Sequence, residues 1–141
     1  MDNDHVLVFR SAVDSLRTAN ELLREGVDRD HFSPVQWARE MCSIHCSSGR
    51  RIGKTAYITE RAEKGDLIIT SYMHLCDALK PRTKAEITYA PCLSLLAKDF
   101  KEYNTIFIDE PAQVFKQISK EALYKLLVVP GKEQTFILLG E

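Results

Sequence analysis

The sequence predicts an α/β fold, in which a mainly parallel sheet of about five strands is covered by helices on both faces. Two observations lead to this prediction. Short apolar segments alternate along the chain with segments whose apolar residues recur at helical spacing. The length of 141 residues, without repeats or a long linker, fits a single domain. We expect residues 1–31 to form an N-terminal helical extension and residues 32–141 to form the core.

Two helices are predicted at the start of the chain. Apolar residues recur at helical spacing over residues 6–24, and Gly26 ends the pattern. A second, short helix is predicted after Ser33, whose side chain suits the capping position. Pro34 suits the first helical position, and Gln36 stands where a capping box has Glu or Gln.

Strands and helices are then expected to alternate to the end of the chain. The clearest strands are Thr105–Asp109 and Thr135–Leu139, because each has three or four consecutive apolar residues. Further strands are expected over residues 41–47, 66–70 and 86–89, the last at an edge of the sheet. Helices are expected over residues 56–64, 72–79, 91–100 and 119–127.

The charge of the chain is nearly balanced but unevenly distributed. Nineteen Lys and Arg against twenty Asp and Glu give a net charge of -1, which excludes a global basic field. Residues 48–64 and 80–101 each carry five basic and two acidic residues, a net charge of +3. Such stretches suit phosphate-rich ligands, although solvated helix faces would look the same.

Hydropathy predicts a chain that neither crosses a membrane nor carries a secretory signal. The longest apolar runs have four residues, whereas a membrane-spanning helix needs about 20. The first residues are acidic, and no apolar segment of a signal peptide follows them. We therefore expect a cytoplasmic location and no membrane partner.

The cysteines predict free thiols rather than a metal centre. No Cys-x-x-Cys pair is present, and the spacings are irregular. A zinc site is disfavoured because alternate residues of the strand expected over 41–47 would point to opposite faces. The potential ligands would have been Cys42, His45, Cys46, His74 and Cys76.

The strongest motif is an eight-residue segment that matches G-x-x-x-x-G-K-[ST] except at its first position, where Ser stands for Gly. Its residues are Ser48, Gly49, Arg50, Arg51, Ile52, Gly53, Lys54 and Thr55. In such a loop, backbone N–H groups and the start of the following helix surround phosphate groups. Lys54 is then expected to bind the β- and γ-phosphates, and the Thr55 hydroxyl to bind Mg²⁺.

A second motif follows at the end of the strand predicted over residues 105–109. Asp109 and Glu110 come directly after three apolar strand residues. Asp109 at this position can hold a magnesium ion, and Glu110 can activate the attacking water. A solvated strand end that caps the next helix would have the same sequence. The prediction of a metal and water site therefore depends on the order in which the two motifs follow each other along the chain.

With these motifs the chain resembles P-loop NTPases of the additional-strand, catalytic-glutamate class. It is most similar to the ATPase cores of viral DNA-packaging terminases and of RecA-like helicases. The paired arginines Arg50 and Arg51 are typical of terminase-like loops. The segment Phe32-Ser33-Pro34-Val35-Gln36 resembles the upstream glutamine motif, and Asp109-Glu110-Pro111-Ala112-Gln113 resembles the helicase Asp-Glu-Ala-Gln box with one inserted residue. Phe136 to Glu141 resembles the coupling strand that follows that box.

The resemblance implies a three-layer α/β/α, RecA-like P-loop domain that binds and hydrolyses ATP with Mg²⁺. It implies that strand 135–139 lies between the phosphate-loop strand and the Asp109 strand. Gln36 would contact adenine, with its role as a capping residue as the alternative. Arg51 or Arg50 would stabilise the transition state, with plain solvation of the loop as the alternative. Lys54 would be solvent-facing without nucleotide.

Two functions from different classes follow. In the first, the chain is a Mg²⁺-dependent ATPase of the helicase or terminase kind. It acts on nucleic acid, with DNA favoured, as a homo-oligomer or in a larger viral complex, in the host cytoplasm if viral. In the second, it is an interaction protein that reuses the fold to bind a host or viral protein with little or no hydrolysis. Complete motifs favour the first, whereas the near-neutral charge and the expectation that no further domain follows the last strand favour the second.

Overall fold

A computed structural model describes residues 2–47, 53–97 and 102–141 of the chain, with the side chains of residues 2–5 and 97 left out. Its centre is a sheet of five strands in the order β1-β5-β4-β2-β3, and every pair is parallel. The strands are β1 (Ser43–Cys46), β2 (Leu67–Thr70), β3 (Glu86–Tyr89), β4 (Thr105–Asp109) and β5 (Thr135–Leu139). This confirms the parallel sheet, the edge position of β3, and the expected place of β5 between β1 and β4.

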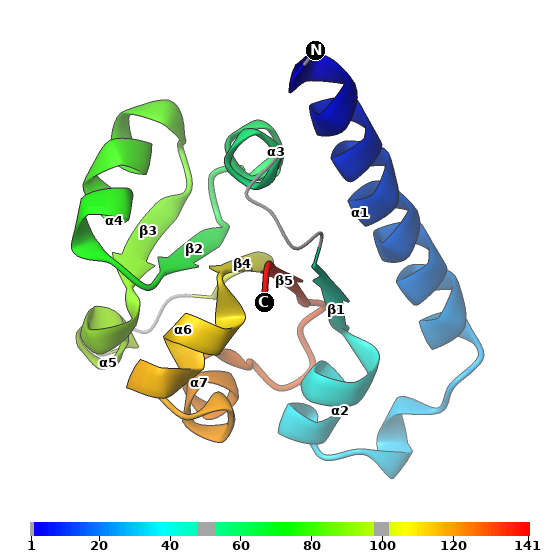
Figure 1. Ribbon diagram of the computed structural model, residues 1–141. Helices are drawn as coiled ribbons and strands as arrows, with labels where there is room; N and C mark the ends of the chain where they lie inside the picture. Colours follow the sequence, from blue (N-terminus) through cyan, green and yellow to red (C-terminus); the bar gives the residue numbers. More distant parts are fainter. Residues whose placement is uncertain (1, 48–52, 98–101) are drawn as a thin grey trace.

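Helices cover both faces of the sheet, as Figure 1 shows. One face carries α1 (Asp2–Glu25), α3 (Lys54–Arg61) and α4 (Met73–Leu79). The other face carries α2 (Pro34–Met41), α5 (Leu93–Ala97), α6 (Pro111–Gln117) and α7 (Lys120–Leu127). Short 3₁₀ turns lie at Arg29–His31, Lys80–Arg82 and Ala90–Cys92. None of the helices in the described ranges is long and apolar enough to cross a membrane.

The two apolar cores follow from the alternation of side chains along buried parallel strands. In β4, Ile106 and Ile108 face the α2/α5/α6/α7 side, whereas Phe107 faces the α1/α3/α4 side. All three side chains are fully buried. α1 belongs to this architecture, since it contributes Phe9 and Val13 to the core beneath α3.

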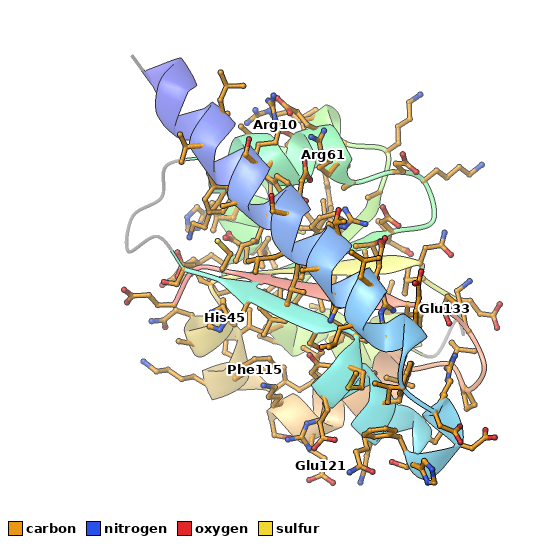
Figure 2. All side chains as sticks on the ribbon, turned by 90° about the vertical axis from the view of Figure 1, so that its right-hand side faces the viewer. Arg10, His45, Arg61, Phe115, Glu121 and Glu133 are labelled. Carbon is orange, nitrogen blue, oxygen red and sulfur yellow. The ribbon has the colours of Figure 1, made fainter. Side chains whose placement is uncertain are left out.

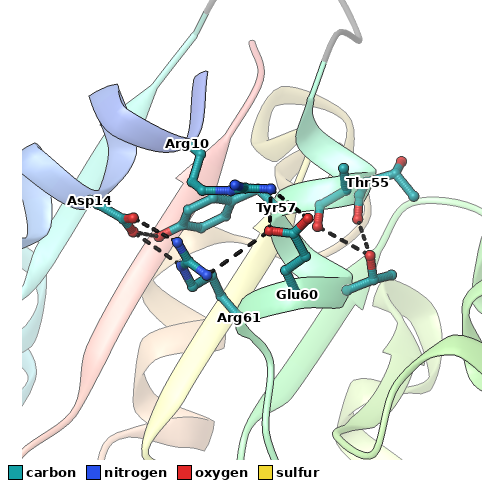
Figure 3. A network of polar contacts seen from close by, with 8 residues as sticks. Arg10, Asp14, Thr55, Tyr57, Glu60 and Arg61 are labelled. Atoms are coloured by element: carbon teal, nitrogen blue, oxygen red, sulfur yellow. Dashed lines mark hydrogen bonds and ion pairs between the residues drawn. The ribbon is translucent and has the colours of Figure 1, made fainter. Parts of the chain in front are cut away.

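Polar contacts tie α1 to α3, the helix that begins with the Gly-Lys-Thr motif (Figure 3). Arg61 donates to both carboxylate oxygens of Asp14, at 2.8 and 3.3 Å, and the Tyr57 hydroxyl donates to the same carboxylate at 3.0 Å. The hydrogen bond from Arg61 holds the pKa of Asp14 below its usual value. Arg10 binds Glu60 at 2.5 Å. α1 thereby fixes the position of α3 on the sheet.

Local sequence signals explain most element boundaries. The Ser33 hydroxyl accepts a hydrogen bond from the backbone N–H of Gln36 at 3.2 Å, and Ser119 caps α7 in the same way. Three differences from expectation stand out. α3 begins at Lys54 rather than at residue 56, α1 begins at Asp2, and α6 follows Glu110 where no helix was predicted.

Candidate phosphate-binding site

Three neighbouring strands end at the same level on the carboxyl edge of the sheet. Leu139 of β5 is paired with Cys46 of β1 on one side and with Asp109 of β4 on the other. One residue later the ladder continues, because Gly140 N donates to Cys46 O and Glu110 N donates to Leu139 O, each at 2.9 Å. The segments that follow β1, β4 and β5 therefore start side by side. Parallel sheets characteristically bind ligands at this edge.

Lys54 reaches this edge from the first turn of α3. Gly53, just before it, has φ 87°, a left-handed conformation that favours glycine. A Cβ at Gly53 would lie 2.9 Å from the Cβ of Phe9, so α1 also excludes a side chain there. Lys54 is only 5% exposed, which corrects the expectation of a solvent-facing lysine. Burial is possible because two carboxylates surround its amine.

The lysine amine joins the two predicted motifs in one cluster. Lys54 Nζ donates to Glu110 Oε1 and lies 3.6 Å from Asp109 Oδ1. The Asp109 side chain is 13% exposed and that of Glu110 is 29% exposed. The negative charges of the two carboxylates compensate the positive charge of the buried amine. An incoming phosphate would compete with Glu110 for Lys54, because both offer oxygen acceptors to the same ammonium group.

The backbone of Glu110 is held in a rarely populated conformation. Its φ of 53° and ψ of 69° make it the one non-glycine residue with positive φ among those described. Its amide donates to Leu139 O, and its carbonyl accepts from Gln113 N and Val114 N at 3.0 and 3.1 Å. Such conformations persist where surrounding contacts enforce them, and they concentrate at functional sites. Here the turn aims the Glu110 carboxylate at Lys54.

Two residues at this site were missed by the sequence analysis of the motifs. Gly140 has φ 106°, and a Cβ there would lie 2.9 Å from Glu110 Cδ and 3.0 Å from Lys54 Nζ. His45 lies one residue before the end of β1, and its Nε2 is 2.7 Å from the Gly140 carbonyl, to which it donates as the Nε2–H tautomer. Figure 2 shows His45 at the sheet edge opposite Glu133. A glycine directly after an apolar strand was the available signal for a close approach.

Gly140→Ala should disturb the Lys54–Glu110 contact as well as strain the backbone. We expect a loss of about 1–3 kcal/mol from the positive φ alone, plus a further loss because the methyl group collides with the ion pair. Gly131→Ala is the matched control, since Gly131 has φ 83° but no atom within 4 Å of an added Cβ. Thermal unfolding of both variants measures the difference. Equal losses would show that Gly140 is needed for its conformation only.

Of the remaining predicted site residues, the structure describes only some. Thr55 lies in the first turn of α3 with an exposed side chain, next to Lys54. The Gln36 side chain is exposed in the first turn of α2, and the Gln36 backbone N–H donates to the Ser33 hydroxyl. Within the described residues, no hydrogen bond or ion pair joins Gln36 to the Lys54 cluster. Ser48, Gly49, Arg50, Arg51 and Ile52 lie outside the described residues.

The donor set at this edge suits magnesium better than zinc. The Asp109 carboxylate and the Thr55 hydroxyl are oxygen donors, and Mg²⁺ in phosphate sites takes one or two carboxylates plus substrate oxygens. Over residues 2–47, 53–97 and 102–141, no group of three or more His, Cys, Asp or Glu is arranged to hold a metal ion. The four cysteines are free thiols.

Comparison of the chain with models of protein families, with curated proteins and with solved structures finds no match.

Proposed function

We propose that this chain is a Mg²⁺-dependent ATPase whose phosphate-binding site is the Lys54–Asp109–Glu110 cluster. The single observation that supports this most is the convergence of the two motifs. Lys54 from the Gly-Lys-Thr segment, Asp109 at the end of β4 and Glu110 directly after it meet at the carboxyl edge of the sheet. They are separated by more than fifty residues in the chain, and the order β1-β5-β4 brings them together.

Each residue has a distinct proposed role. Lys54 binds the β- and γ-phosphates, and Thr55 and Asp109 hold Mg²⁺ through oxygen atoms. Glu110 takes a proton from the attacking water once phosphate has drawn Lys54 away from it. Gln36 as an adenine contact and Arg50 or Arg51 as transition-state cations remain part of the proposal, with Gly49, Ile52 and Gly53 as phosphate-loop backbone.

The biological role that we propose is that of a minimal terminase-like or helicase-like motor core. It would act on nucleic acid, preferentially DNA, in the cytoplasm (that of the host cell if the protein is viral), as an oligomer or in a larger viral complex. The support for this is the motif resemblance together with the strand order of the sheet.

One observation favours a second function, that of a P-loop-like interaction protein without hydrolysis. Lys54 is already bound by Glu110, so the groups proposed for phosphate binding and for water activation neutralise each other. If no nucleotide separates Lys54 from Glu110, the protein keeps the P-loop-like fold but binds only other proteins.

Phosphate release separates the two functions. Purified protein with Mg²⁺ and ATP should release phosphate, and single- or double-stranded DNA should raise the rate. Omission of Mg²⁺ is the control. No release above the background of a heat-denatured sample, with or without DNA, would leave the interaction protein as the better account.

A further inference from the structure

The amino edge of the sheet, opposite the Lys54 cluster, carries a groove of about 430 Å³. One wall is the turn between α3 and β2, and the other is the segment between α4 and β3. Both segments precede parallel strands, which places them together at the amino edge. The polar and charged residues that line the groove are Thr59, Glu63, Lys64, Arg82, Thr83 and Lys84.

Hydrogen bonds hold the two walls in place. The Asp66 carbonyl accepts from Glu86 N at 3.0 Å, which joins the start of β2 to the start of β3. The Asp66 carboxylate accepts from Glu63 N at 2.9 Å and from Thr105 N at 3.1 Å. Asp66 is 6% exposed, so these bonds are shielded from water. The groove is therefore preformed, and a ligand need not order its walls.

The groove brings together basic residues from two distant stretches of the sequence. Lys64 comes from the basic stretch 48–64, whereas Arg82 and Lys84 come from the stretch 80–101. All three are exposed, and none forms an ion pair with any described residue. Glu63 is the one acidic residue of the lining. Three cations against one carboxylate give the lining of the groove a net positive charge in a protein whose net charge is -1.

The rest of the lining suits phosphate groups rather than peptide side chains. Its apolar residues are only Ala62 and Pro81, so the groove offers no deep pocket for an apolar or aromatic anchor. Thr83 Oγ1 accepts from Ala85 N at 3.1 Å, which leaves the hydroxyl proton available to an oxygen acceptor. Lys, Arg and Thr are the side chains that commonly contact nucleic-acid phosphates.

We propose that this groove binds the sugar–phosphate backbone of a nucleic-acid strand, without reading its sequence. Lys64, Arg82 and Lys84 contact successive phosphates, and the Thr83 hydroxyl donates to one of them. The site is separate from the Lys54 cluster, because α3 begins at the carboxyl edge and its last residues lie beside the groove. Binding there needs neither nucleotide nor hydrolysis.

Fluorescence anisotropy with a labelled, mixed-sequence single-stranded oligonucleotide tests this proposal over a range of salt concentrations. The test variant combines Lys64→Gln, Arg82→Gln and Lys84→Gln. The matched control combines Lys116→Gln, Lys120→Gln and Lys125→Gln, which removes the same charge from exposed positions of α6 and α7 on the other face. Thermal unfolding should show that both variants are folded, because all six substituted side chains are exposed.

The wild type and the control variant should bind with affinities that fall steeply as salt rises. The groove variant should bind at least about tenfold more weakly, with a salt slope shallower by about two units, since each phosphate contact on a single strand contributes about 0.7. Three results would overturn the proposal. They are no binding by the wild type, equal losses in both variants, and tighter binding of a labelled acidic peptide than of the oligonucleotide.

Discussion

Glu110→Gln should lower the rate of ATP hydrolysis by about 10²–10⁴-fold, the usual effect of removing a general base. The amide keeps the shape of the side chain but cannot take a proton from water. Nucleotide affinity should be retained or raised, because the neutral amide competes less with phosphate for Lys54 than the present carboxylate does. Phosphate release measures turnover, and a fluorescent ATP analogue measures affinity.

The control for this substitution is Glu121→Gln, which makes the same chemical change on an exposed position of α7. It should leave both turnover and affinity at the wild-type level. A Glu110→Gln variant that hydrolyses ATP as fast as the wild type would assign water activation to another residue. One that loses nucleotide binding would show that Glu110 orders the site rather than activates water.

Lys54→Ala should abolish stabilisation by Mg²⁺ and ATP. A ligand at about 100 times its dissociation constant adds ~2.7 kcal/mol to the free energy of unfolding, or several degrees in Tm for a domain of this size. The apo variant should also lose about 1–3 kcal/mol, because Asp109 and Glu110 are left without the cation that they share. Thermal unfolding with and without nucleotide measures both effects.

A double variant separates these two effects of Lys54. In Lys54→Ala/Glu110→Ala the repulsion between the carboxylates is gone, so the apo protein should regain part of its stability relative to Lys54→Ala. Stabilisation by nucleotide should stay absent. Recovery of nucleotide binding in the double variant would mean that Lys54 has a structural role and makes no essential contact with phosphate.

The sequence predicts elements well where local signals agree with the fold. The strands Thr105–Asp109 and Thr135–Leu139 have the predicted bounds, because continuous apolar runs identify strands that are buried on both faces. Ser33 and Ser119 cap the helices that follow them, as their side chains predict. The place of β5 came from the resemblance, because composition alone does not give strand order.

The site depends on tertiary contacts that the sequence does not show. Lys54 is buried because strands far apart in sequence end at one level and place two acids beside it. The helix after Glu110 was missed because its start depends on a left-handed turn at a glutamate, which propensity disfavours. Gly140 combines a positive φ with a close approach to Glu110 and Lys54, and the only sequence signal for either was the glycine itself.

Thermal unfolding of the wild-type protein across a titration of ATP with Mg²⁺ tests the central claim, nucleotide binding at the Lys54–Asp109–Glu110 cluster, most directly. Tm should rise with the logarithm of ATP concentration once the dissociation constant is exceeded, by several degrees in total. The rise should disappear when EDTA removes Mg²⁺, and Asp109→Asn should reduce it. An unchanged Tm at millimolar ATP with Mg²⁺ would contradict the claim.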